Sequence, residues 1–230
     1  MKKALLIASA VAATSVFAID SNEISFLPVT PPKANGMMLL AIPFNGYGTG
    51  DSASIAVADV LLTDGLAAGD NIYLPNGTAG KYDEYTLSSD KTAWTASRVV
   101  DVTGGSIVTT EGTPAPQATI ARGSAFWLKS SATSVKLLGQ AATQDTTTVS
   151  ATAGYQLLAP TTSENDILIS SLAGEKGDMI ILADGTRYQK TANSGWRNLA
   201  NRTTEITSSD KIPAGVGFWY KAGGSRSLTL

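Results

Sequence analysis

The chain of 230 residues contains neither histidine nor cysteine, and it carries a net charge of −2 with charged residues making up 16% of the sequence. The missing residue types exclude serine–histidine and cysteine–histidine catalysis and ordinary zinc, copper or haem ligation. The slightly acidic balance argues against nucleic-acid binding, which needs a basic surface. A chain of this length buries an adequate core without disulfides.

The N-terminal segment, residues 1–18, has the pattern of a secretory signal peptide. Lys2 and Lys3 precede an uncharged stretch over residues 4–17, and the small residue Ala18 ends the segment. The apolar run is shorter than the ~20 residues that a membrane-spanning helix needs. We therefore expect cleavage after Ala18 and no membrane span in the mature chain. The composition favours a secreted bacterial protein, located in the periplasm, on the cell surface or outside the cell.

The mature chain contains one set of motifs twice. Residues 120–129 (IARGSAFWLK) align without a gap with residues 212–221 (IPAGVGFWYK). Further matched pairs are residues 39–41 with 157–159 and residues 69–72 with 177–180. A duplicated unit must present a similar face to its neighbour. We expect a mainly β fold made of two homologous antiparallel β units in tandem, residues 19–140 and 141–230, each resembling a sandwich or barrel with at most one short helix.

Strand, helix and turn patterns follow one another in each unit. Alternating apolar residues predict strands, an apolar run after serine predicts a short helix, and Asn-Gly or Asp-Gly predicts a tight turn. In the first unit these are strands over 24–29 and 37–42, a helix over 55–61, a turn at 76–77, the strand containing Phe126, and a closing strand over 135–138. In the second they are strands over 146–152 and 155–159, a helix or strand over 166–172, a turn at 184–185, the strand containing Phe218, and a closing strand over 227–230. The longer loops of the first unit, 46–50 and 104–116, are where the units should differ most.

The four tryptophans fall into two equivalent pairs, and each Phe-Trp pair is followed by a lysine. The residues concerned are Trp94, Trp127, Lys129, Trp196, Trp219 and Lys221. On a strand, one ring of a Phe-Trp pair points inward and the other outward. The tryptophans fill the cores of their own units, with the outward ring of a Phe-Trp pair packed at the seam between units, or they form a stacking platform for a glycan with the lysines as hydrogen-bond donors.

Two aspartates occupy equivalent positions of the units, Asp70 and Asp178. A glycosidase needs two carboxylates ~5–10 Å apart, and these two could meet that only across a shared seam. We prefer turns in which each aspartate accepts local backbone hydrogen bonds. No calcium-loop motif accompanies them, so Ca²⁺ is conceivable but without motif support, and we expect no cofactor. The sequence predicts no catalytic or metal-binding residue.

The shared features follow one order along the chain: GxxLLAxP, a short helix, GDxI, Tyr, Trp and GxGFW. With this order the chain resembles exported repeat proteins that are common in planctomycete and verrucomicrobial genomes. Residues 212–219 match best, whereas the first unit departs from the pattern with RGSA before Phe126. The resemblance implies export and an all-β repeat fold, and it implies no activity or site residues.

Export, the missing catalytic residue types and strand-rich repeats predict a non-enzymatic structural subunit of the cell surface or extracellular matrix. Its expected partners are copies of itself, assembled into a layer or filament by the pairing of strand edges. Residues Ile24, Phe26 and Val29 lie on a strand that could be donated to a neighbour or paired within its own unit. The alternative function is a carbohydrate-binding module that uses the paired tryptophans and tyrosines.

Overall fold

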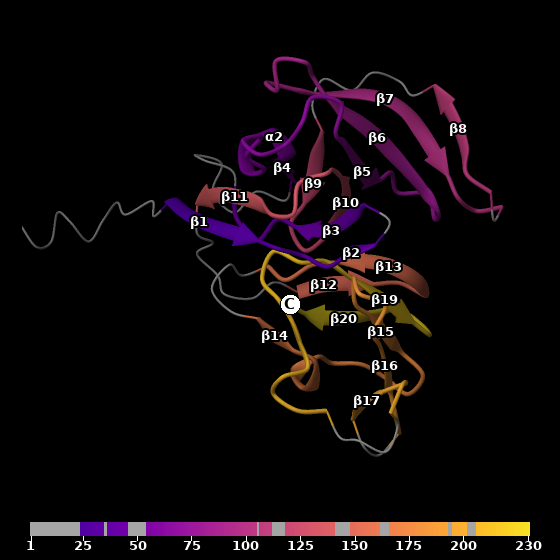
Figure 1. The fold of residues 1–230 in the computed structure, drawn as a ribbon. Coiled ribbons are helices and arrows are strands. Elements are labelled where there is room, and N and C mark those ends of the chain that lie inside the picture. The colour runs from indigo at the N-terminus through magenta and orange to yellow at the C-terminus, as the bar shows by residue number, and fades with distance from the viewer. Residues whose placement is uncertain are drawn as a thin grey trace, which may run out of the picture.

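The computed structural model describes residues 24–34, 36–45, 54–104, 106–111, 118–140, 148–161, 166–192, 195–201 and 206–230. The expected signal peptide, residues 1–18, lies outside the described residues. As predicted from the sequence, the fold is mainly β, with antiparallel sheets (Figure 1). Among the described residues, the helical segments are the short helix α2 (Val57–Val60) and the 3-10 turn η1 (Ile169–Ser171).

The first half of the chain is built on a seven-stranded sheet. Its strands, in spatial order, are β2 (Lys33–Ala34), β3 (Met37–Ala41), β10 (Ala125–Lys129), β5 (Asn71–Pro75), β6 (Lys81–Leu87), β7 (Trp94–Asp101) and β8 (Val108–Glu111). Two strand pairs accompany this sheet, β1 (Ile24–Val29) with β11 (Val135–Gln140) and β4 (Ser54–Ala56) with β9 (Thr119–Ala121).

The second half is built on a five-stranded sheet with a corresponding order of pairing. Its strands are β13 (Gly154–Leu158), β19 (Phe218–Ala222), β15 (Met179–Ile181), β16 (Arg187–Lys190) and β17 (Trp196–Asn198). The accompanying pairs are β12 (Thr148–Ala151) with β20 (Arg226–Thr229) and β14 (Ile167–Leu168) with β18 (Lys211–Ile212). The registers correspond too, because Phe126 lies opposite Leu40 in one sheet and Phe218 opposite Leu158 in the other.

Each half has its own hydrophobic core on one face of its sheet. Phe126 and Phe218 are fully buried, one in each core, and the tryptophan that follows each of them points to the opposite face. Burial of large apolar side chains is the dominant favourable contribution to folding, so each half has a core that supports its own sheet. The first core includes Leu40, Ile72, Trp94 and Leu137, and the second includes Leu158, Ile180, Trp196 and Leu228.

The two halves meet through reciprocal backbone contacts. The amide of Ala41 donates to the carbonyl of Gly215 at 2.9 Å, and the amide of Ala159 donates to the carbonyl of Gly123 at 2.9 Å. Isolated β-bridges repeat this exchange, since Leu40 pairs with Val216 and Leu158 with Ser124. The seam therefore resembles the isologous interface of a twofold dimer, although both sides belong to one chain.

Small residues let the two sheets approach closely at this seam. Leu39, Ala41, Ala125, Leu157 and Ala159 form a third buried cluster between the two cores, with Trp127 and Trp219 packed at its margin. This cluster is formed by the sheet faces turned away from the two main cores. The seam thus covers the part of each sheet that lies nearest to β3 and β13.

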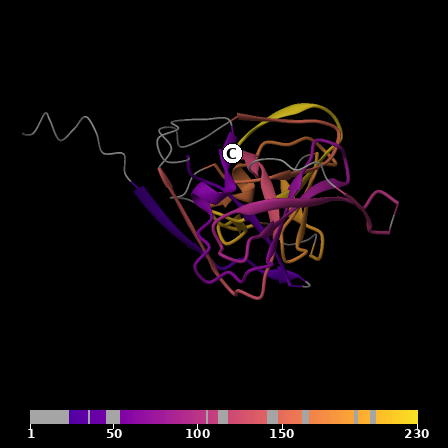
Figure 2. The same ribbon diagram turned by 90° about the horizontal axis from the view of Figure 1, so that it is seen from above.

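Three local expectations need correction. The predicted helix over 55–61 is shorter, because residues 54–56 form strand β4 before α2 begins. The turn that begins at Asn76 is longer than two residues, because the backbone amide of Asn76 donates to the carbonyl of Lys81. The expected loop over 104–116 contains strand β8, and the turn before that strand projects from the molecule in both views (Figure 1, Figure 2).

Candidate functional site

The structure separates the four tryptophans into two kinds. Trp94 and Trp196 are 4% and 1% exposed and lie inside the two cores, so neither offers a ring face to a ligand. Trp127 and Trp219 are partly buried and lie at the margin of the seam. The expected platform is therefore reduced to one tryptophan per sheet, each on the face opposite to the core.

Near Trp219 the second half carries a small aromatic cluster. The ring of Tyr155, which is 56% exposed, meets Trp219 edge to face with centroids 6.5 Å apart. The ammonium group of Lys221 lies 5.3 Å from the centroid of Tyr155, within the range of a cation–π contact. Tyr155 therefore contacts both other side chains, and the lysine predicted as a ligand donor already has a partner.

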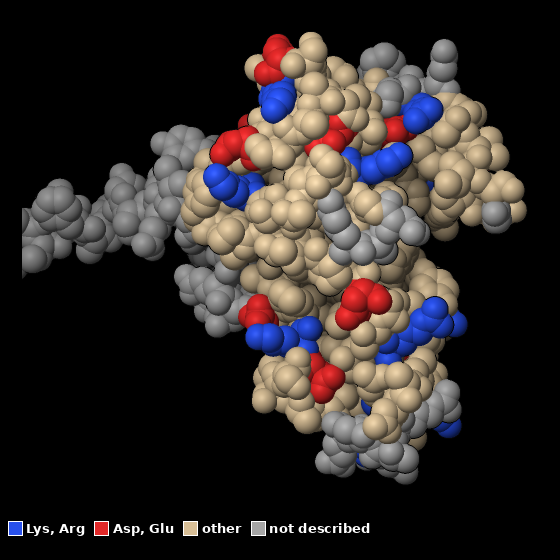
Figure 3. All heavy atoms as spheres, in the orientation of Figure 1, with Lys and Arg blue, Asp and Glu red and all other residues tan. Residues whose placement is uncertain are grey.

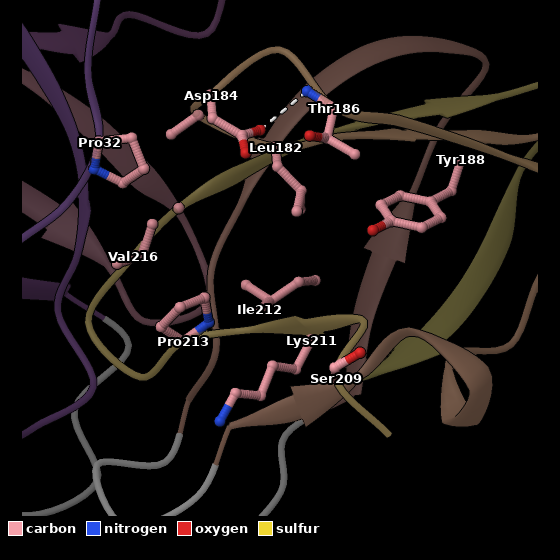
Figure 4. Close-up of a pocket in the computed structure, with 12 residues that line it drawn as sticks. Pro32, Leu182, Asp184, Thr186, Tyr188, Ser209, Lys211, Ile212, Pro213 and Val216 are labelled. Atoms are coloured by element: carbon pink, nitrogen blue, oxygen red, sulfur yellow. Dashed lines mark hydrogen bonds between the residues drawn. The ribbon is translucent and has the colours of Figure 1, made fainter. Parts of the chain in front are cut away.

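A pocket of about 330 Å³ opens where the second half faces Pro32 of the first (Figure 4). Its apolar wall includes Leu182, Ile212 and Val216. Its polar groups serve the fold: the ammonium of Lys211 is 2.6 Å from Asp166, whose pKa it lowers. The hydroxyl of Tyr188 donates to Asp210 at 2.7 Å, and burial together with this bond raises the tyrosine pKa. The pocket has few polar groups left to orient a ligand.

A row of chemically distinct side chains crosses the first sheet on the face opposite to its core. Leu39, Trp127, Tyr73, Glu84 and Arg98 lie opposite one another on the successive strands β3, β10, β5, β6 and β7. Directly opposed residues of antiparallel strands project to the same face. The row begins at the apolar seam and ends in charged side chains at the far side of the sheet.

The charged part of this row is a hydrogen-bonded triad of Tyr73, Glu84 and Arg98. Glu84 is 1% exposed, and it accepts a bond of 3.1 Å from the hydroxyl of Tyr73. The guanidinium of Arg98 forms an ion pair with the same carboxylate through Nε, and through Nη2 at 3.2 Å. Burial and the neighbouring carboxylate raise the pKa of Tyr73 to about 12. The bond to Glu84 raises the pKa of Arg98, whose side chain is half exposed.

More polar and aromatic groups lie beside the triad on this face. Lys129, Asn71 and Thr86 form a second cross-strand row on the same strands. The hydroxyl of Thr86 donates to the amide oxygen of Asn71 at 2.7 Å. Tyr82, two residues before the buried glutamate, is partly buried and packs against the seam cluster. We call Trp127, Tyr73, Tyr82, Glu84, Arg98, Lys129, Asn71 and Thr86 the first-sheet face.

The second half has no equivalent of the triad. By the same register, the positions of Tyr73 and Glu84 are occupied there by Ile181 and Arg187. No sequence pattern singles out Tyr73, Glu84 or Arg98, because residues 11 to 14 positions apart form no local motif. Only the pairing register of β5, β6 and β7 brings them together.

The two equivalent aspartates each hold a turn. Asp70 accepts the amide of Ala67 at 2.9 Å and the hydroxyl of Ser130 at 2.6 Å. Asp178 is 1% exposed and accepts the hydroxyl of Tyr220 at 2.6 Å. The described residues contain no group of three or more acidic side chains placed to hold a metal ion.

The backbone interactions of Asp178 complete its turn. Its carboxylate accepts the amides of Glu175 at 2.9 Å and Gly223 at 3.1 Å, and it lies 3.1 Å from the guanidinium of Arg226. The two aspartates therefore use their oxygens to organise separate turns, one in each half.

The edges of the first sheet differ in how they are protected. At one edge β2 has only two residues, begins with Lys33 and follows Pro31–Pro32. At the other edge β8 lies beyond β7 and contains neither lysine nor proline. Ile107 and Val108 are 74% and 56% exposed, and residues 102–110 contain no charged side chain. Native edge strands are usually short, charged or interrupted by proline. Strand β8 is short and ends in Glu111, but residues 108–110 of the strand carry no charge and no proline.

The strand considered for donation to a neighbour is paired within its own chain. Ile24, Phe26 and Val29 lie opposite residues of β11, and Val29 is buried in the first core. Figure 2 shows β1 at the periphery of the molecule, where Phe26 is 54% exposed. Pro28 in the middle of β1 removes a backbone donor, which weakens its outer edge for further pairing.

Charged side chains are scattered over the face shown in Figure 3, where neighbours of opposite sign are interspersed and no large area has one sign. No helix among the described residues has the length and apolar character to cross a membrane. No protein family, curated protein or solved structure matches the chain.

Proposed function

We propose that this chain is an exported, non-enzymatic structural subunit of a bacterial cell surface or extracellular matrix, and that it associates with copies of itself. The observation that carries this proposal is the outer edge of β8, to which no described strand is bonded: it is uncharged over residues 108–110, and Ile107 and Val108 are exposed beside it. Unpaired amide and carbonyl groups of such an edge are a template for another strand. The export signal of residues 1–18 supports a location outside the cytoplasm.

The composition of the β8 edge favours a second copy as the partner. Residues 102–110 are uncharged, and Glu111 at the end of β8 is the one charged residue of the strand. In an antiparallel pair the two copies of Glu111 lie at opposite ends, so the uncharged stretches can approach without electrostatic repulsion. Thr109 and Thr110 are exposed threonines, which pair favourably across antiparallel strands. Antiparallel pairing of two β8 strands would extend the seven-stranded sheet of one copy directly into that of the next.

We also infer that the chain consists of two homologous β units joined in tandem. The corresponding strand orders, the matched registers of Phe126 and Phe218, and the reciprocal bonds of the seam support this inference. The second sheet ends at β17, a strand of three residues that contains Arg197. The edge proposed for association therefore belongs to the first unit alone.

The test is the mass of the mature protein, residues 19–230, in solution over a range of concentrations. Light scattering behind gel filtration should show dimers or larger species whose fraction rises with concentration, and electron microscopy should show their form. The variant Val108→Lys places a charge on the β8 edge and should shift the protein to monomers at concentrations where the parent associates.

Leu168→Lys is the matched control, since it places the same charge on a residue that is 39% exposed and lies away from this edge. Its association should equal that of the parent. A parent protein that stays monomeric at high concentration would contradict the proposal, and so would a Val108→Lys variant that associates as strongly as the parent.

A further inference from the structure

The first-sheet face combines partly exposed aromatic rings with hydrogen-bonding groups held in fixed positions. Trp127 and Tyr73 lie opposite each other on neighbouring strands, so their rings share one face of the sheet. Both are partly buried, which means that each ring is held by its neighbours and still presents surface to solvent. Aromatic side chains held in this way bind the apolar C–H face of a sugar ring with little loss of conformational entropy.

Arg98 supplies directed donors beside these rings. Its guanidinium has five N–H groups, and the bonds to Glu84 use two of them. The buried carboxylate fixes the plane of the half-exposed guanidinium, so the remaining donors point in defined directions. A planar group with several parallel donors matches two adjacent hydroxyls of a sugar.

We propose that the first-sheet face binds a neutral polysaccharide chain. The rings of Trp127 and Tyr73 would contact the sugar faces, and Arg98 would donate hydrogen bonds to the hydroxyls. The second row, with Lys129, Asn71 and Thr86, would contact the hydroxyls of the same chain along its length.

The charge of the site decides between a neutral and an acidic ligand. The positive charge of Arg98 is compensated by Glu84, which is buried directly beneath it. Lys129 is then the one cation of this face without a compensating carboxylate on the face. A site of this kind attracts hydroxyl groups through hydrogen bonds, and it lacks the cluster of cations that holds a polyanion.

Burying the charged groups of the triad costs desolvation free energy, and the fold alone does not explain why the chain accepts that cost. A buried charge pair is often no more stabilising than a well-packed apolar pair of the same size. The second half replaces Tyr73 and Glu84 with Ile181 and Arg187 and still forms its sheet. The triad is thus dispensable for this sheet architecture, which agrees with a role in binding.

Affinity electrophoresis tests the proposal with the mature protein in gels that contain one soluble polysaccharide each. The neutral probes are hydroxyethyl cellulose, laminarin, xylan and galactomannan, and the acidic probes are alginate and polygalacturonate. At least one neutral probe should retard the parent protein. Arg98→Gln combined with Glu84→Gln, which removes both charges together, should weaken that binding at least tenfold, and so should Tyr73→Leu combined with Trp127→Leu, which removes both rings.

The matched controls are Arg187→Gln and Trp219→Leu, which make similar changes in the second half. Each should bind as the parent does. Near-ultraviolet circular dichroism checks that every variant is folded, and Lys129→Ala serves as a further variant on an exposed residue of the face, with an expected loss of affinity of a few-fold. Tryptophan fluorescence of the parent should change on binding, and this change should disappear in Trp127→Phe and persist in Trp219→Phe.

Three results would overturn the proposal. One is that no neutral probe retards the parent. Another is retardation by the acidic probes alone, which would indicate binding through surface lysines. The third is binding that responds to changes at Arg187 or Trp219 and is unaffected by changes at Arg98, Tyr73 or Trp127.

Discussion

Gly217 is the position where the seam leaves least room for a side chain. A Cβ atom added there would lie 2.3 Å from the Cβ of Ala125 and 3.0 Å from Cγ of Leu39. The backbone of Gly217 is not in the left-handed region, so the substitution Gly217→Ala tests steric contact alone. Both neighbouring atoms belong to the first half, and the glycine belongs to the second.

The expected cost follows from this overlap. Carbon atoms in contact are normally ~3.5–4.0 Å apart, so the new methyl group would force the two sheets apart or distort one strand. Overpacking of this kind destabilises proteins by about 1–3 kcal/mol. For a protein of this size each kcal/mol lowers the melting temperature by roughly 2–4 °C, so the variant should melt roughly 2–12 °C below the parent.

Urea unfolding followed by tryptophan fluorescence measures this difference, and a double-mutant cycle assigns it to the seam. Ala125→Gly removes the methyl group that clashes, so the double variant should recover most of the stability that Gly217→Ala loses. Gly104→Ala is the control, because no atom lies within 4 Å of its added Cβ. A Gly217→Ala variant as stable as the parent, or strictly additive effects in the cycle, would refute the close contact between the halves.

Three further predictions concern buried polar groups. Trp196→Phe removes a 2.8 Å bond from the indole to a buried carbonyl, whereas the indole N–H of Trp94 has no partner among the described residues, so by urea unfolding Trp196→Phe should cost about 1–3 kcal/mol more than Trp94→Phe. Equal costs would contradict that bond. Asp178→Asn removes the buried carboxylate that pairs with Arg226 and leaves that guanidinium only the exposed carboxylate of Glu175, so it should cost about 3–5 kcal/mol, with a smaller loss for Asp70→Asn in the same assay; the reverse order would count against the buried network. The pKa of Tyr73 is raised to about 12, so its contribution to stability is fully present below pH 10 and is lost as the pH rises towards 12. Tyr73→Phe should therefore reduce the fall in stability over that range, and an unchanged alkaline profile would argue against a partly buried phenol that is bonded to Glu84.

The sequence predicts much of the fold because local patterns are strong there. The strand expected over residues 24–29 is observed with those bounds as β1, and the strand over 37–42 ends one residue earlier as β3. In both, apolar residues alternate or run continuously next to a turn. Gly77 and Gly185 lie in turns at the predicted places, although both turns are longer than the two residues expected, and their φ values of +82° and +88° are ones that glycine adopts without strain.

Strand β8 was missed because its neighbourhood has the composition of a loop. Glycine, serine and threonine surround residues 107–108, and an exposed strand has no buried face to produce alternation. Its strand conformation comes from pairing with β7, which is a tertiary interaction. Context of this kind overrides local propensity in sheets.

The triad was missed for a related reason. The pairing of β6 with β7 shifts between Glu84 and Tyr85, so that Glu84 faces Arg98 while Tyr85 faces Ala96. The extra residue of β7, Ser97, is a bulge, and a bulge redirects the side chains that follow it. Glu84 and Tyr85 are consecutive and both buried. They therefore break the alternation of buried and exposed residues by which a strand is recognised in a sequence.

The position of β8 has a consequence for valency. It lies at the end of the same sheet that carries Trp127, Tyr73 and Arg98, and no described strand is bonded to its outer edge. A pair of copies joined at β8 would carry two such faces on one continuous sheet. When one face holds a polymer, the second meets the same or a neighbouring chain at high effective concentration, which raises avidity without any new contact. The pair would then act as a cross-link between polymer chains, although each copy alone has a single binding face.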